Sequence, residues 1–162
     1  YIAFNIANLI LVVPYSLGTS LFVEGSHGEG LKKNSIRAFG ASLVLLVPSV
    51  LVIFFFGDLI LGLLGKQYGE AFDLLMVLAL SSFLVTIYCL FIPIQNVRIK
   101  LESIVAINCT RCILLLSLSY VFINMYGILG IGYGWLITHG VITLEIGWIL
   151  IKEFRTNNLK II

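Results

Sequence analysis

The chain has 162 residues, of which 60% are apolar and only 11% are charged, with a formal net charge of +2. Soluble domains carry about 25% charged residues, so this composition excludes an ordinary water-soluble domain and indicates a surface that faces lipid. The basic residues lie in short polar segments and form no dense patch, which argues against nucleic acid as a partner.

Five apolar segments approach or exceed the roughly 20 residues that a helix needs to cross a bilayer. They cover residues 2–23, 38–64, 71–94, 103–123 and 128–151. Lipid does not tolerate unpaired backbone, and the alternation of a membrane barrel is missing from the sequence, so each segment is predicted to be a helix. The predicted fold is all-α, a polytopic transmembrane helix bundle that forms a single membrane domain over residues 1–162.

Lysine and arginine are distributed unequally between the connections. Eight of the ten lie in residues 24–37, in residues 95–102 and in a tail of residues 152–162. Because cytoplasmic loops are enriched in these residues, both connections and the tail are predicted to be cytoplasmic, with Tyr1 outside. The chain does not begin with methionine, and a cytoplasmic N-terminus would require an odd number of earlier spans. We therefore expect a fragment of a longer, multi-pass protein of the cell membrane.

The first apolar segment carries a polar stripe of Asn5, Asn8, Tyr15, Ser16 and Thr19, which fall within about 100° of arc on a helix. Asparagine is costly against lipid, so this face is expected to meet protein or water. Hydrogen bonding between helices and the wall of a hydrated cavity both fit the pattern. The cavity interpretation makes Asn5, Asn8 and Ser16 candidate substrate-binding residues.

The third and fifth segments contain small residues that favour helix packing. Ser82, Thr86 and Cys89 follow one side of the third segment, and Gly130 and Gly134 form a GxxxG motif in the fifth. Such residues let neighbouring helices approach closely, so we expect packing faces here.

Two cysteines, Cys109 and Cys112, form a CxxC motif inside the fourth segment, and Cys89 lies in the third. Because no second pair or histidine completes a ligand set, we expect packing residues and neither a metal site nor a cofactor. A histidine of the fifth segment, His139, is expected to be buried and satisfied by Thr143 rather than to relay protons.

The fourth segment contains Arg111 about 12 Å from its cytoplasmic end, with Asn108 on the same face. Glu145 of the fifth segment is expected at a similar depth, so a structural ion pair between Arg111 and Glu145 is one interpretation. The other is that Arg111 and Asn108 bind an anionic substrate, with Glu145 as the charge partner in the resting state.

Three stretches together resemble a known family. They are PYSLGTSLFVEGSHGEGLKKN at residues 14–34, FGDLILGLLGKQYGEAFDLLMVLALS at residues 56–81 and YGILGIGYGWLI at residues 126–137. The chain is similar to the C-terminal part of polysaccharide and oligosaccharide flippases in the multidrug/oligosaccharidyl-lipid/polysaccharide exporter superfamily. The resemblance implies a place in one lobe of a larger two-lobe transporter with twelve or fourteen helices. In a twelve-helix member, the five segments would match the eighth to twelfth helices.

The same resemblance implies a function. Such flippases move lipid-linked oligosaccharide or polysaccharide precursors across the cytoplasmic membrane by alternating access. The expected partners are membrane lipid, a polyprenyl-linked glycan and the missing N-terminal helices of the same protein.

Two alternatives remain open at this point. A cation-coupled multidrug exporter of the same superfamily would use an intramembrane carboxylate, for which Glu145 is the candidate. A membrane-embedded enzyme that processes lipids or glycans would need converging acid/base groups, and Asp58, Glu70 and Asp73 are the nearest candidates. We expect these acids to form a solvated helix end, and therefore predict no catalytic residue and no enzyme activity.

Overall fold

The computed structural model describes residues 1–27 and 30–155, apart from the side chains at 66, 67, 70 and 154. Five long helices follow one another in this part of the chain: α1 (Ile2–Ser26), α2 (Leu31–Leu64), α3 (Phe72–Val97), α4 (Leu101–Tyr126) and α5 (Ile128–Arg155), with a short 3-10 helix η1 (Lys66–Ala71) before α3. All five long helices are long and apolar enough to cross a membrane. The prediction of an all-α helical bundle is confirmed.

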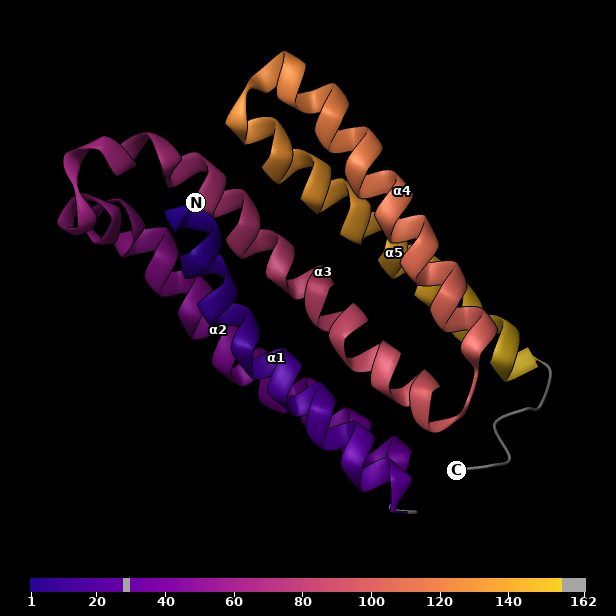
Figure 1. The fold of residues 1–162 in the computed structure, drawn as a ribbon. Helices are drawn as coiled ribbons and strands as arrows, with labels where there is room; N and C mark the ends of the chain where they lie inside the picture. Colours follow the sequence, from indigo (N-terminus) through magenta and orange to yellow (C-terminus); the bar gives the residue numbers. More distant parts are fainter. Residues whose placement is uncertain (28–29, 156–162) are drawn as a thin grey trace.

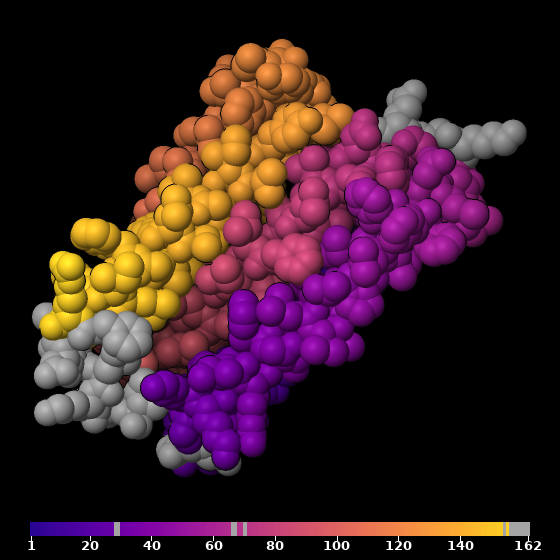
Figure 2. Space-filling model, turned by 180° about the vertical axis from the view of Figure 1, so that it is seen from behind, coloured from indigo at the N-terminus to yellow at the C-terminus, as the bar shows by residue number. Residues whose placement is uncertain are grey.

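The central helix of the arrangement is α3 (Figure 1), with α1 and α2 on one side of it and α4 and α5 on the other. On the face seen in Figure 1, α1 and α4 flank α3, and on the opposite face, seen in Figure 2, α2 and α5 flank it. Extensive packing joins α4 to α5, whereas α4 touches α3 only lightly and does not touch α1. The described chain therefore forms two layers around one central helix.

The core runs along α3. Its buried Leu74, Leu75 and Leu78 pack against Ala3 and Ala7 of α1, and α2 adds buried aliphatic side chains to the same cluster. The predicted packing residues Ser82, Thr86 and Cys89 are all buried, which confirms that interpretation. Because lipid tails are as apolar as leucine, such contacts gain their stability from close packing rather than from escape from water.

Glycines bring α4 and α5 together. A Cβ at Gly130 would overlap the main chain of Phe122, and a Cβ at Gly134 would lie 2.9 Å from Ser119 Oγ. The GxxxG motif is therefore a close-packing face, as predicted. The turn between the two helices is the single residue Gly127, whose φ of 60° is a conformation that glycine adopts without strain.

The helices extend beyond the predicted spans. Residues 24–37 were expected to form a polar connection, but α1 continues to Ser26 and α2 begins at Leu31, so Lys32, Lys33 and Arg37 lie on α2. The reason is that lysine and arginine are good helix formers, while a hydropathy window detects only the lipid-crossing part of a helix. At 34 residues, α2 is about 51 Å long, which exceeds the hydrocarbon thickness.

The predicted tail is also partly helical. Lys152 and Arg155 belong to the last turn of α5, where positive charge complements the helix dipole. The rest of the predicted tail, residues 156–162, lies outside the described residues.

Candidate functional site

The candidate substrate-binding residues Arg111 and Asn108 meet at one aromatic ring. The guanidinium carbon of Arg111 lies 4.6 Å from the ring centre of Tyr88 on α3. The Tyr88 hydroxyl donates a hydrogen bond of 2.8 Å to Asn108 Oδ1, and Asn108 Nδ2 donates to the carbonyl of Ile104. Because Asn108 lies one turn before Arg111 on α4, both side chains reach the same residue of α3.

A second tyrosine extends this group towards α1. Tyr15 is 48% exposed and lies beside the thiol of Cys89, which directly follows Tyr88 on α3. Arg111 is close enough to act electrostatically on both Tyr15 and Cys89. We call Asn8, Tyr15, Tyr88, Asn108 and Arg111 the polar face. Its residues lie on α1, α3 and α4, and Figure 1 shows α1 and α4 on either side of α3.

The polar stripe of α1 is exposed. Asn5, Asn8, Ser16 and Thr19 all face away from the described helices. The Ser16 and Thr19 hydroxyls donate to carbonyls four residues earlier on α1, at 2.8 and 3.0 Å, so they do not join neighbouring helices. Asn8 lies two turns before Tyr15 on the same side of α1, whereas Asn5 and Ser16 lie further around the helix. The structure shows none of these three candidates in contact with the arginine of α4.

The predicted ion pair between Arg111 and Glu145 is not formed. Among the residues that the structure describes, the ion pairs join Glu153 to Arg98 and to Lys100. One carboxylate oxygen of Glu145, Oε2, is buried without a hydrogen-bond partner. The similar depth of two residues does not determine the direction in which their side chains point around the helix axis. The Arg111 side chain points to α3 rather than to α5.

The carboxylate that does pair is Glu153, near the end of α5. It accepts from Arg98 Nη1 at 2.9 Å, from Lys100 Nζ at 2.5 Å and from Gln95 Nε2 at 3.3 Å. Gln95 is fully buried and Glu153 is 8% exposed. Sequence reasoning missed this cluster. A usable signal was present, because Glu153 is an acid among the basic residues that follow the fifth segment, and the connection of residues 95–102 is also basic.

His139 is buried behind the polar face. Its Nδ1 lies 2.9 Å from the carbonyl of Trp135, and its ring is tilted against the Trp135 ring at 4.7 Å and edge-on to Tyr88 at 6.4 Å. The Thr143 hydroxyl donates to the main-chain carbonyl of His139 rather than to the ring. The expected burial is confirmed, but the partner of the ring is a carbonyl one turn earlier, not the threonine. His139 thus contacts the same tyrosine ring as Arg111.

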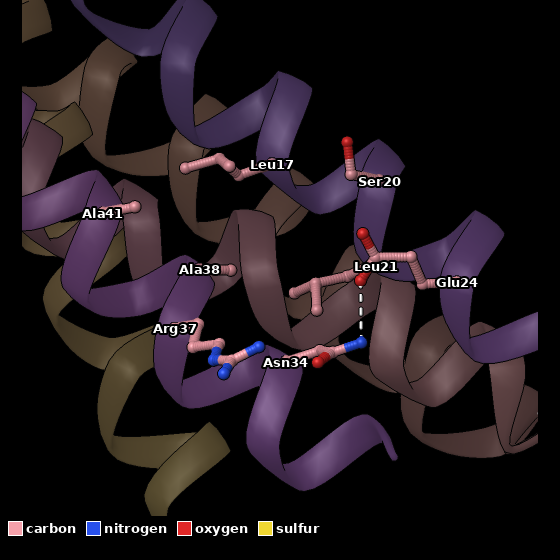
Figure 3. Close-up of a pocket in the computed structure, with 8 residues that line it drawn as sticks. All are labelled: Leu17, Ser20, Leu21, Glu24, Asn34, Arg37, Ala38 and Ala41. Atoms are coloured by element: carbon pink, nitrogen blue, oxygen red, sulfur yellow. Dashed lines mark hydrogen bonds between the residues drawn. The ribbon is translucent and has the colours of Figure 1, made fainter. Parts of the chain in front are cut away.

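A separate cleft of about 290 Å³ lies between α1 and α2 (Figure 3). Glu24 and Asn34 close one end of it with a hydrogen bond of 2.8 Å from Asn34 Nδ2 to Glu24 Oε2, and Arg37 lines the cleft beside them. This cleft holds one acid and one base, so its charge favours neither an anion nor a cation.

The remaining candidates show no convergence. Asp58 and Asp73 are exposed, and the side chain of Glu70 lies outside the described residues. Cys109 and Cys112 are exposed on α4 rather than packed as predicted, because α4 contacts little except α5. Within the part of the chain that the structure describes, no three potential metal ligands come together.

No protein-family model matches this chain, and no curated protein or solved structure is significantly similar to it.

Proposed function

We propose that this chain is part of one lobe of a membrane transporter that flips a lipid-linked oligosaccharide across the membrane by alternating access. The observation that carries this proposal is the polar face, in which Arg111 lies over Tyr88 beside Asn108 and pairs with no carboxylate among the residues that the structure describes. The overall resemblance of the sequence to polysaccharide flippases supports the same proposal.

The exposure of the polar face argues for a missing partner surface. In α4, all of which the structure describes, Ile107 is the one buried residue, so Asn108 and Arg111 lie on a helix that is largely uncovered. An arginine in the middle of a bilayer costs about 2.5–3.5 kcal/mol on insertion scales, so direct contact with lipid is unfavourable. Further helices of the same protein, facing α1, α3 and α4 across a hydrated cavity, would remove that cost.

The chemistry of the polar face suits a phosphate. A guanidinium stays charged at any accessible pH and donates paired hydrogen bonds to phosphate oxygens. The Tyr88 ring holds Arg111 by a cation–π contact, which leaves the N–H groups at the edge of the guanidinium free to meet a ligand. Asn108 and Asn8 add amide groups that can bind sugar hydroxyls. Tyr88 thereby holds the Arg111 guanidinium while no substrate is bound, which is the role that we expected of Glu145.

Transport by purified protein tests this proposal. Proteoliposomes would hold the protein and a fluorescent, short-chain polyprenyl-diphosphate oligosaccharide, and flipping would be read by quenching from outside. Arg111→Lys keeps the positive charge but loses the planar guanidinium with its paired N–H donors. We expect this variant to reduce the flipping rate at least tenfold. The matched control is Arg37→Lys, an exposed arginine of α2 outside the polar face, which should transport normally. Flipping that survives Arg111→Ala at normal protein levels would contradict the proposal.

A second candidate function is favoured by Glu145. A buried carboxylate oxygen without a hydrogen-bond partner, here Oε2, is suited to bind a proton or a cation. That favours a cation-coupled exporter of small molecules. Drug efflux that depends on an imposed ion gradient and is lost in Glu145→Gln, with no effect of Arg111→Lys, would support this second function over the first.

A further inference from the structure

A groove of about 520 Å³ lies between α2, α3 and α5, on the face opposite the polar face (Figure 2). Its volume falls in the range of about 300–1,000 Å³ that is typical of ligand pockets. Most of its walls are aliphatic or aromatic, with contributions from all three helices; they include Ile36, Phe39, Ile87, Phe91, Ile146 and Leu150.

Positive charge lies at one end of this groove. Lys32 belongs to the first turn of α2, and Arg98 directly follows the last residue of α3. Ile87 lies eleven residues before Arg98 on α3, which places it about 16 Å deeper along the helix. The groove is therefore cationic where the helices end and apolar towards the middle of the bundle.

Among the described residues around Arg98, positive charge exceeds negative charge. The carboxylate of Glu153 balances one of the two charges of Arg98 and Lys100, and Lys32 adds a further positive charge. The hydrogen bond to Glu153 uses Nη1 of Arg98, and a guanidinium has five N–H donors in total, so donors remain for a second acceptor.

We propose that this groove is a binding site for an anionic glycerophospholipid. The phosphate would lie between Lys32 and Arg98, and one acyl chain would lie along Ile36 and Phe91 towards Ile87. Such a lipid has its single negative charge at interface depth and its chain below, which matches the distribution of charge in the groove. The groove shares no residue with the polar face, so this proposal does not rest on the proposed function.

Native mass spectrometry of the purified protein tests the site, with phosphatidylglycerol and phosphatidylcholine added separately as probes. We expect one tightly retained phosphatidylglycerol, and weaker retention of phosphatidylcholine. Lys32→Gln should lower the affinity for phosphatidylglycerol about fivefold, since a basic residue near a membrane surface contributes about that factor. Lys33→Gln is the matched control, because Lys33 is exposed and does not line the groove.

A second variant tests the apolar part without a change in charge. Ile36→Trp should fill the groove and displace the lipid, whereas Ile113→Trp, at a similarly exposed position of α4, should not. Equal retention of both lipids would overturn the proposal, as would equal losses in Lys32→Gln and Lys33→Gln. A disulfide formed between two copies through Ile36→Cys would show that the groove is covered by a second chain instead.

Discussion

Gly134 of α5 lies against Ser119 of α4 so closely that a Cβ at Gly134 would be 2.9 Å from Ser119 Oγ and 3.0 Å from its main-chain nitrogen. One turn away, Gly130 faces the main chain of Phe122 at even closer range. These two contacts bring the backbone of α4, in its last turns, close to the backbone of α5, in its first turns. Since α4 packs mainly against α5, its attachment depends on the close fit between these two helices.

Replacing Gly130 with alanine is predicted to destabilise the protein. The added methyl group would overlap the carbonyl of Phe122, and backbone cannot yield as a flexible side chain can, so we expect a loss of about 1–3 kcal/mol. Thermal unfolding in nanodiscs measures the change. Gly140→Ala is the matched control: nothing lies within 4 Å of its Cβ position, and alanine is the better helix former, so its Tm should stay equal or rise.

The role of Tyr88 can be divided between its ring and its hydroxyl. Tyr88→Phe keeps the ring under Arg111 and loses the hydrogen bond to Asn108, at an expected cost of about 0.5–1.5 kcal/mol. Tyr88→Leu should cost a further 1 kcal/mol or so, because the cation–π contact is lost as well. Tyr120→Leu, on the exposed side of α4, controls for the loss of a tyrosine. Equal stability of Tyr88→Phe and Tyr88→Leu would show that Arg111 does not use the ring.

Glu153→Gln should loosen the end of α5. The change leaves Arg98 and Lys100 without their counter-charge in a largely buried site, and we expect a loss of about 1–3 kcal/mol. Hydrogen exchange of the last turns of α5 should accelerate in this variant. Glu102→Gln, an exposed acid at the start of α4, should leave the exchange unchanged. If both variants exchange as the wild type does, the cluster does not hold α5 in place.

The orientation in the membrane is predicted from lysine and arginine and can be measured by cysteine labelling. In a background without Cys89, Cys109 and Cys112, a cysteine at Ser26 should be shielded from impermeant thiol reagents in intact cells. A cysteine at Met125, which lies near the end of α4 and is 65% exposed, should react. The reverse pattern would invert the topology and place the basic ends of the helices outside.

Hydropathy was enough to predict the five long helices, because 20 or more apolar residues have few alternatives to a helix in lipid. It could not predict the start of α2 at Leu31, since the first turns of that helix carry Lys32 and Lys33 and lie outside the apolar window. The GxxxG motif predicted a close-packing face on α5, because glycines at a spacing of four allow two backbones to approach closely. It did not predict which helix packs there; the structure shows that it is α4.

The site was predictable only in part. Arg111 and Asn108 stood out because polar residues are rare in membrane helices, but Tyr88 did not, since a tyrosine in an apolar segment is unremarkable until its hydroxyl is seen to bind Asn108. The pairing of Arg111 with Glu145 failed because a sequence gives the depth of a residue and leaves the rotation of its helix undetermined. That rotation is set by packing, here by Gly130 and Gly134 against α4.

The one-residue turn at Gly127 also constrains how the protein is made. A ribosome-bound chain releases its helices from the translocon into the bilayer in order. Because α4 carries Arg111, the transfer of α4 by itself into the bilayer has a higher free-energy cost. Because only Gly127 separates the two helices, α4 cannot span the bilayer unless the start of α5 also enters it. We therefore expect the two helices to insert together as a helical hairpin. Lengthening this turn should then impair biogenesis before it impairs the finished fold.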